Sequence, residues 1–154
     1  MKIENIIRRV LREQEENLSE LPPFDDFFDS DWNLALNFMN RYPNKKFYYL
    51  GDLDLSYSQI ETLGNLVRVE GNLDLTHTDI ETLGNLEYVG GDLDLAHSNV
   101  ESLGNLKYVG SHLYLLYTLL SEKYTEEEIR DMVEVIEDIV MEDDGLTMGD
   151  DDDW

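Results

Sequence analysis

The sequence predicts an α/β repeat fold: a short solenoid of about five parallel strands, with turns of about twenty residues and helical caps at both ends. Three consecutive blocks of twenty residues, which begin at Gly51, Gly71 and Gly91, are nearly copies of one another. A fixed period near twenty residues is typical of turns that stack on one another. Apolar residues fall at the same places in every block, and helical apolar patterns flank the blocks.

Each block contains the motif Leu-x-Leu, in which both leucines point to one side of a strand. Leu53, Leu73 and Leu93 form one column, so each turn adds one strand to a parallel sheet and the stacked turns bury the leucines together. The glycine that opens each block marks a bend or a close backbone approach. The other apolar columns are Leu55–Leu75–Leu95, Ile60–Ile80–Val100, Leu63–Leu83–Leu103, Leu66–Leu86–Leu106 and Val69–Val89–Val109.

A column of hydroxyl side chains follows the strands. We interpret these side chains as caps for backbone groups at a corner of the coil, because no general base accompanies them at a constant spacing. They are Ser58, Thr78, Ser98 and Thr118.

The strand pattern continues beyond the three copies. Residues 109–115 predict a fourth strand, and residues 135–141 predict a last one, with Glu137 in the glycine position. Between them, Thr125 and Glu128 form a capping box, which predicts a short helix over about 126–133. Residues 43–120 are therefore the predicted solenoid, and residues 121–141 are its C-terminal cap.

Two strings in this region are Leu-Gly-Asn-Leu-x-x-Val-Gly-Gly-x-Leu-x-Leu and Leu-Ser-x-Lys-Tyr-Thr-Glu-Glu-Glu-Ile-Arg. Together they resemble a leucine-rich-repeat-like family that is common in bacteriophage and environmental virus genomes, over about residues 47–141. The resemblance implies a repeat fold and a viral accessory or virion-associated protein, located in the virion or the host cytoplasm. It supplies no catalytic residues, and the last strand departs from the family pattern at Glu137.

The segment before the solenoid predicts two helices and a linker. Residues 1–17 form an amphipathic helix that either packs on the open end of the solenoid or serves as a docking segment for another protein. Residues 18–30 are an acidic and aromatic linker, and a helix over 31–42 is the N-terminal cap, ended by Pro43. The apolar stripe of the first helix is Ile3, Ile6, Ile7, Val10 and Leu11, and that of the second is Trp32, Leu34, Ala35, Phe38 and Met39.

The chain is strongly acidic, with 35 acidic and 11 basic side chains and a formal net charge of −24. Nucleic acid and anionic membranes are disfavoured as partners, because phosphate binding needs clustered lysine and arginine. Cysteine is absent, which excludes disulfides and thiolate metal sites. No apolar run reaches the ~20 residues of a membrane span, and the N-terminus lacks the pattern of a secretory signal.

Two rows of side chains project between the leucines of the predicted strands. Neighbouring strands lie about 4.8 Å apart, so the second row is a ladder of like charges, which destabilises a sheet. It favours a partner with a basic patch; the alternatives are a Ca²⁺ site at its aspartates and a solvated face that serves only solubility. The rows are Asp52–Asn72–Asp92–His112 and Asp54–Asp74–Asp94–Tyr114.

Beside these rows, Tyr57, His77, His97 and Tyr117 form a further column. Two histidines are too few for a structural zinc site, which takes four ligands. We therefore interpret this column as a stacked polar and aromatic surface row.

Residues 142–154 are an acidic tail that we predict to be disordered. Its end, four aspartates that run to Asp153 and then Trp154, resembles the acidic C-termini of single-stranded-DNA-binding proteins, which dock into basic pockets on their partners. The alternative is a tail that serves solubility alone.

The chain contains no Gly-x-Ser-x-Gly, no phosphate loop and no His-Glu-x-x-His. We therefore predict no enzymatic activity and no cofactor. The predicted function is protein–protein interaction through the acidic strand face, the termini or both. The alternative is an acidic inhibitor that imitates nucleic acid and blocks a host DNA-binding or defence protein, and a weaker one is a Ca²⁺-binding structural solenoid.

Overall fold

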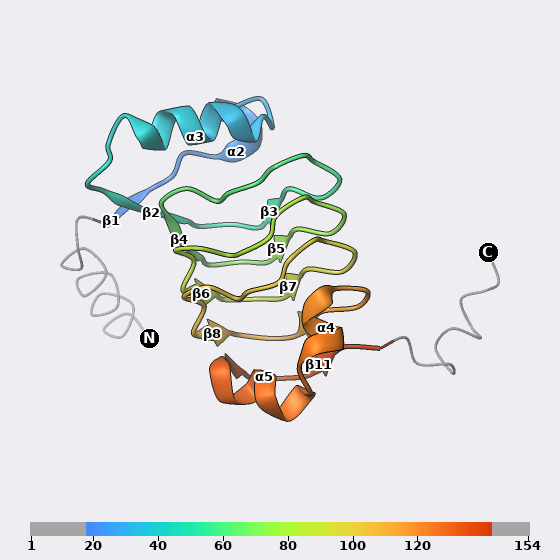
Figure 1. Ribbon diagram of the computed structural model, residues 1–154. Coiled ribbons are helices and arrows are strands. Elements are labelled where there is room, and N and C mark those ends of the chain that lie inside the picture. Colours follow the sequence, from blue (N-terminus) through green and yellow to red (C-terminus); the bar gives the residue numbers. More distant parts are fainter. Residues whose placement is uncertain (1–17, 143–154) are drawn as a thin grey trace, which may run out of the picture.

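The computed structural model describes residues 18–142 and shows an α/β protein with two parallel sheets (Figure 1). From β2 onward the chain visits the sheets alternately, so each turn contributes one strand to each sheet. The six-stranded sheet consists, in spatial order, of β1 (Leu18–Glu20), β2 (Lys46–Tyr49), β4 (Leu66–Val69), β6 (Tyr88–Val89), β8 (Tyr108–Val109) and β10 (Glu134–Val135). The five-stranded sheet consists of β3 (Leu53–Asp54), β5 (Leu73–Asp74), β7 (Leu93–Asp94), β9 (Leu113–Tyr114) and β11 (Ile139–Val140).

The prediction of a single sheet of about five strands is wrong in number. The pattern Val-x-Gly-x-Leu-x-Leu, which we predicted as one strand, forms two strands that belong to different sheets. The chain bends between them, for example at Gly90 and Gly91, where the second block meets the third. The valine before the bend therefore starts no Leu-x-Leu strand; it belongs to the six-stranded sheet.

The leucine column is the spine of the five-stranded sheet. Leu53 pairs in register with Leu73, Leu73 with Leu93, and Leu93 with Leu113, and Ile139 takes the place of leucine in the last turn. All are buried, as sequence periodicity predicted. Full burial of one such side chain contributes about 1.5–3 kcal/mol, so the column is a main source of stability.

Successive turns approach each other's backbones closely at the bend. A Cβ atom on Gly110 would fall against the carbonyl oxygen of Gly90, and one on Gly90 against that of Glu70. The predicted close approach is also present at Gly71 and Gly91, where a Cβ atom would overlap the side chain of the preceding turn.

The hydroxyl column caps backbone carbonyls, as predicted. The Thr78 hydroxyl donates to the Leu75 carbonyl oxygen at 2.8 Å, and the Ser98 hydroxyl donates to that of Leu95 at 2.7 Å. The hydroxyls of Ser58 and Thr118 repeat this bond to residues three positions earlier. Each bond satisfies a carbonyl group at the corner that follows a five-stranded-sheet strand.

Replacing Thr78 with valine should lower the free energy of unfolding by about 1–2 kcal/mol, because valine keeps the shape but removes the donor to a buried carbonyl. Thr78 is only 3 % exposed, so water cannot replace the hydroxyl. Urea unfolding measures the loss, with Thr78→Ser as the control that keeps the donor. Equal stability of the valine variant and the wild type would contradict this role.

Two helices cover the N-terminal end of the core, α2 (Phe24–Phe27) and α3 (Trp32–Asn40) (Figure 1). Trp32 is buried and donates from Nε1 to the Thr62 carbonyl oxygen at 2.8 Å, which ties α3 to the first turn. Leu34, which we placed on the apolar face of this helix, is exposed. The predicted linker over 18–30 also holds regular structure, because β1 pairs with β2 and α2 buries Phe24.

The C-terminal end carries α4 (Leu119–Lys123) and α5 (Glu126–Met132). The capping box is confirmed: Thr125 Oγ1 accepts the Glu128 N–H at 3.2 Å, and Glu128 Oε1 accepts the Thr125 N–H at 2.9 Å. The short helix α4, capped by Thr118, was not predicted. The chain then enters β10 and β11, which end the two sheets.

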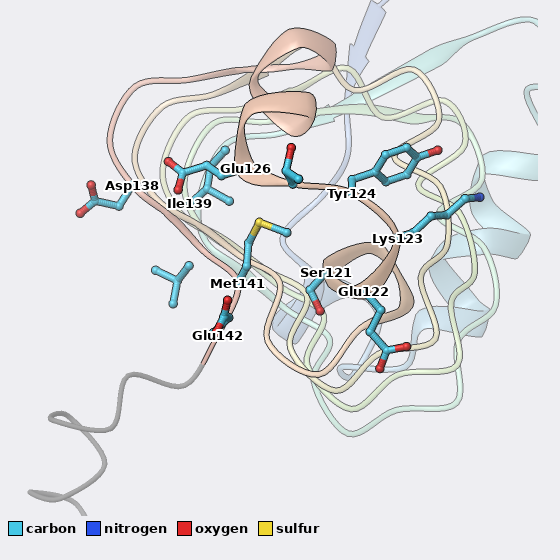
Figure 2. A pocket seen from close by; sticks show the side chains of 11 residues that line it. Ser121, Glu122, Lys123, Tyr124, Glu126, Asp138, Ile139, Met141 and Glu142 are labelled. Atoms are coloured by element: carbon cyan, nitrogen blue, oxygen red, sulfur yellow. The ribbon is translucent and has the colours of Figure 1, made fainter.

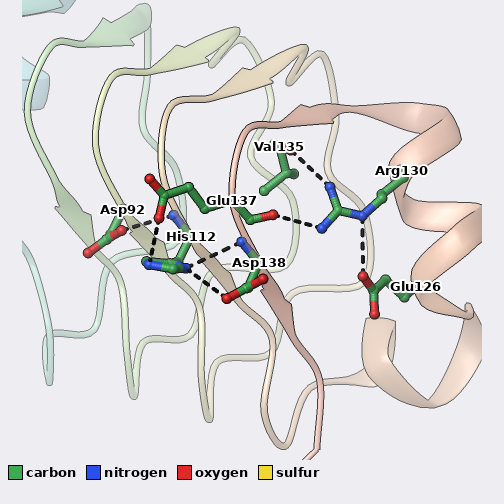
Figure 3. A network of polar contacts seen from close by, with 7 residues as sticks. All are labelled: Asp92, His112, Glu126, Arg130, Val135, Glu137 and Asp138. Carbon is green, nitrogen blue, oxygen red and sulfur yellow. Dashed lines mark hydrogen bonds and ion pairs between the residues drawn. The ribbon is translucent and has the colours of Figure 1, made fainter.

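Arg130 of α5 closes the edge of the six-stranded sheet (Figure 3). Its Nη1 donates to the Val135 carbonyl oxygen at 2.9 Å, and its Nη2 donates to that of Glu137 at 2.7 Å. One turn earlier, the equivalent carbonyls of Val109 and Ser111 accept the backbone N–H groups of Ile136 and Glu137 in the last turn. One guanidinium thus replaces the two N–H groups that a further turn would supply.

Candidate interaction surface

The outward face of the five-stranded sheet holds the predicted acidic rows. Asp54 pairs in register with Asp74, and Asp74 with Asp94, on the residues that alternate with the buried leucines. Tyr114 follows Asp94 in the next strand. We call this surface the acidic face; it comprises Asp52, Asp54, Asp74, Asp92, Asp94, His112 and Tyr114.

The row that begins at Asp52 is a ladder of hydrogen bonds between turns. Asp52 Oδ1 accepts the Asn72 N–H at 2.8 Å, Asn72 Oδ1 accepts the Asp92 N–H at 2.7 Å, and Asp92 Oδ1 accepts the His112 N–H at 2.9 Å. Each side chain therefore binds the backbone twenty residues further on. This role is structural, and it fixes one oxygen of each carboxylate in place.

His112 continues the ladder into the last turn (Figure 3). The Asp138 N–H donates to Nδ1 at 3.3 Å, and Nε2 is 3.2 Å from Glu137 Oε1. Asp138 also places a carboxylate oxygen 3.8 Å from Nδ1. His112 is thus a linker between turns at the end of the acidic face.

The row that begins at Asp54 caps the turn after each strand. Asp54 Oδ1 accepts the N–H of Ser56 at 3.0 Å, Asp74 Oδ1 accepts that of Thr76 at 3.0 Å, and Asp94 Oδ1 accepts that of Ala96 at 3.1 Å. Asparagine would accept the same bond without the charge. The turn therefore explains an Asx side chain at these positions but not the repeated negative charge.

Repulsion within the acidic face is visible at its centre. Burial raises the pKa of the Asp94 carboxyl; the Ala96 N–H opposes this shift, while the charges of Asp74 and Asp92 add to it. Burial and the charges of Asp92 and Asp94 likewise raise the pKa of Tyr114. Among the described residues, the charge that lowers the pKa of Asp94 is that of His97. A cation placed here by a partner would therefore relieve the repulsion between the carboxylates.

The predicted surface row of rings is a continuous stack. Ring centroids are 4.4 Å apart from Tyr57 to His77, 4.5 Å from His77 to His97 and 4.5 Å from His97 to Tyr117. All four residues have positive φ between 56° and 61°, an unusual conformation outside glycine. Residues 18–142 contain no group of three or more histidine, aspartate or glutamate side chains that could hold a metal ion, so the predicted Ca²⁺ site gains no support.

A second stack on the six-stranded sheet was not predicted. The Arg68 guanidinium lies 4.0 Å from the centroid of the Tyr88 ring, and the rings of Tyr88 and Tyr108 are 4.9 Å apart. The three residues repeat at twenty-residue spacing. That spacing could have predicted the stack, but its meaning was not recognised because the six-stranded sheet itself was not predicted.

A hollow of about 760 Å³ lies at the C-terminal end, between α4, the start of α5 and β11 (Figure 2). Met141 and Tyr124, both half-buried, contribute its apolar part. Its other lining residues include Glu122, Glu126, Asp138, Glu142 and Lys123.

The predicted binding residues of the two termini are not placed. None of the helices in residues 18–142 has the length and apolarity that crossing a membrane requires. Those predicted binding residues, which lie outside the described range, are Ile3, Ile6, Ile7, Val10, Asp153 and Trp154.

Comparisons of the chain with protein-family models, with curated proteins and with solved structures find no match. The resemblance to a leucine-rich-repeat-like viral family therefore stays a prediction. What the chain does has to be argued from its own geometry.

Proposed function

We propose that this chain is a leucine-rich-repeat-like solenoid that acts as a non-enzymatic protein–protein interaction module, and that its acidic face binds a basic patch on another protein. The supporting observation is the in-register row of Asp54, Asp74 and Asp94, whose charge the turn geometry does not require. Charges arranged in this way give specificity and fast association with a complementary surface.

The hydrogen bonds prepare this surface for binding. The Asp74 Oδ1 atom is held by the N–H and the hydroxyl of Thr76, at 3.0 and 2.8 Å, and the same pair of bonds holds Asp54. A rigid carboxylate loses little side-chain freedom when a lysine or arginine approaches, so less binding energy is lost to ordering.

The variant that combines Asp54→Asn, Asp74→Asn and Asp94→Asn tests the proposal. At neutral pH and low salt it should be more stable than the wild type by about 1 kcal/mol, because the turn bonds remain and the like charges are gone.

In the wild type the folded-state pKa of Asp94 lies above its unfolded value. The folded state therefore holds more protons between the two pKa values, and the stability of the wild type rises as the pH falls through that window. The gap between variant and wild type, measured by urea unfolding at several pH values, should close in acid.

The same variant should lose its partner. Wild-type protein and variant serve as baits in parallel. For each protein that only the wild type retains, the binding affinity is then measured for the wild type and for the variant. The control removes three charges from another exposed column, through Glu61→Gln, Glu81→Gln and Glu101→Gln, and should keep the partner. Equal binding by the wild type and the aspartate variant would overturn the proposal, and equal loss in both variants would show a nonspecific charge effect.

The nucleic-acid imitator and the Ca²⁺-binding solenoid stay predictions. Three rungs at about 4.8 Å spacing cover only about 10 Å, whereas one turn of duplex DNA covers about 34 Å. The acidic face is therefore better matched to a small basic patch than to a nucleic-acid groove.

A further inference from the structure

The two sheets end differently at the C-terminal end of the molecule. The edge of the six-stranded sheet is closed, because Arg130 binds the carbonyls of Val135 and Glu137. The edge of the five-stranded sheet is β11, and no strand of residues 18–142 pairs with its outer side. An open strand edge is a template for another chain, and proteins normally block it.

The register of the inner strands shows which groups this edge presents. The N–H groups of Leu113 and Leu115 donate to the carbonyls of Asp138 and Val140 in the next turn. Ile139 pairs in register with Leu113, so the N–H groups of Ile139 and Met141 point to the position of a further strand. β11 has only two residues, which itself limits pairing, but it carries neither proline nor lysine, two of the usual blocking residues.

The hollow at the C-terminal end lies directly beside this edge, since β11 forms one of its walls (Figure 2). The half-buried side chains of Met141 and Tyr124 can receive an apolar side chain. Four carboxylates line the hollow against one lysine, Lys123, and one of the four, Glu126, is already paired with Arg130. Those carboxylates belong to Glu122, Glu126, Asp138 and Glu142.

We infer that β11 and this hollow bind an extended basic segment of a partner protein, which adds to the five-stranded sheet as a further strand. Its backbone carbonyls accept the N–H groups of Ile139 and Met141, an apolar side chain enters the hollow, and its lysines or arginines face the carboxylates. The chain's own residues 143–154 are the wrong occupant by charge, because they contain six aspartates and no basic residue. This site adjoins the acidic face, since Asp138 of the hollow contacts His112, but it uses other residues and does not depend on the function proposed for that face.

The probe is a fluorescent peptide in which lysine and valine alternate, titrated into the full chain by anisotropy. Met141→Pro removes one edge N–H and should weaken binding roughly tenfold, whereas Met141→Leu keeps the N–H and should bind within about twofold of the wild type. Proline is tolerated at an edge whose N–H faces outward. Should the proline variant fail to fold, Glu122→Lys with Glu142→Lys serves instead and should also weaken binding. A peptide of alternating glutamate and valine should not bind.

Amide hydrogen exchange gives a second measure. The N–H groups of Ile139 and Met141 should exchange fast in the free chain and slowly with the peptide bound. Protection in the free chain would show that the tail or a second copy occupies the edge, and it would overturn the inference. So would equal binding by the Met141→Pro and Met141→Leu variants. Peptide binding that is lost only in the Asp54, Asp74 and Asp94 variant would assign the peptide to the acidic face and reject the edge site.

Discussion

Replacing Gly110 with alanine is expected to lower the free energy of unfolding by about 3 kcal/mol. The new Cβ atom would overlap the carbonyl oxygen of Gly90 in the preceding turn. That oxygen belongs to the backbone and cannot rotate away. The overlap therefore forces two turns apart, and the hydrogen bond from the Gly110 N–H to the Val89 carbonyl, 2.8 Å long, is strained as well.

Gly84→Ala is the matched control. Gly84 has a φ of 55°, so alanine is strained there, but no atom lies within 4 Å of the added Cβ. Only the conformational cost remains, about 1 kcal/mol. Urea unfolding of both variants separates steric overlap from backbone conformation. Equal losses would show that the turns can separate at Gly110 without cost.

Replacing Arg130 with alanine should lower the free energy of unfolding by about 2–3 kcal/mol, because two carbonyl groups lose their donors at once. The bond from Arg130 to the Val135 carbonyl is partly buried, and a charged donor forms a stronger bond there than a neutral one. Unfolding should begin at the C-terminal end, so exchange of the Ile136 N–H should rise more than exchange in the inner turns.

Arg130 also contacts Glu126, with Nε 3.2 Å from Oε2 on the exposed surface. Glu126→Gln removes this ion pair alone and should change stability by less than about 0.5 kcal/mol. Arg130→Lys keeps the charge but cannot reach both carbonyls with a planar fork, so it should behave more like alanine than like arginine. If the glutamine variant lost as much stability as the alanine variant, the ion pair and not the backbone contact would be the important one.

Periodicity predicted the part of the fold that depends on repeated identity. The columns of Leu53 and Leu55 are buried in register because a twenty-residue repeat brings equivalent residues together whatever the local conformation is. The capping box at Thr125 was readable because its two partners are three residues apart.

The six-stranded sheet was not predictable from local pattern. Strands such as β6 and β8 have only two residues, so no alternation of apolar and polar side chains is available to reveal them. The column of Val69, Val89 and Val109 was recognised, but Val109 was assigned to the same strand as Leu113 and Leu115. Both sheets require the bend at the glycines. That bend depends on contacts between neighbouring turns, so no local pattern reveals it.

The acidic face was located correctly, while the local role of its carboxylates was missed. An aspartate two residues before Ser56 or Thr76 is a signal for a side-chain turn, and that signal was present in the sequence. The bond between Asp52 and the Asn72 N–H spans twenty residues, and no local rule indicates it. The role of Arg130 likewise depends on where α5 lies against the last turn.

The constant register also bears on how the chain folds. Leu53 pairs with Leu73, twenty residues on, and the longest step within the five-stranded sheet, from Leu113 to Ile139, is only twenty-six residues. Closing the longer loop costs only about 0.2 kcal/mol more in chain entropy than closing the shorter one. Although the sheets are parallel, the paired strands of the five-stranded sheet are only twenty to twenty-six residues apart, so the entropy lost in pairing them is small for a parallel sheet. Folding can then proceed by adding one turn at a time to those already formed.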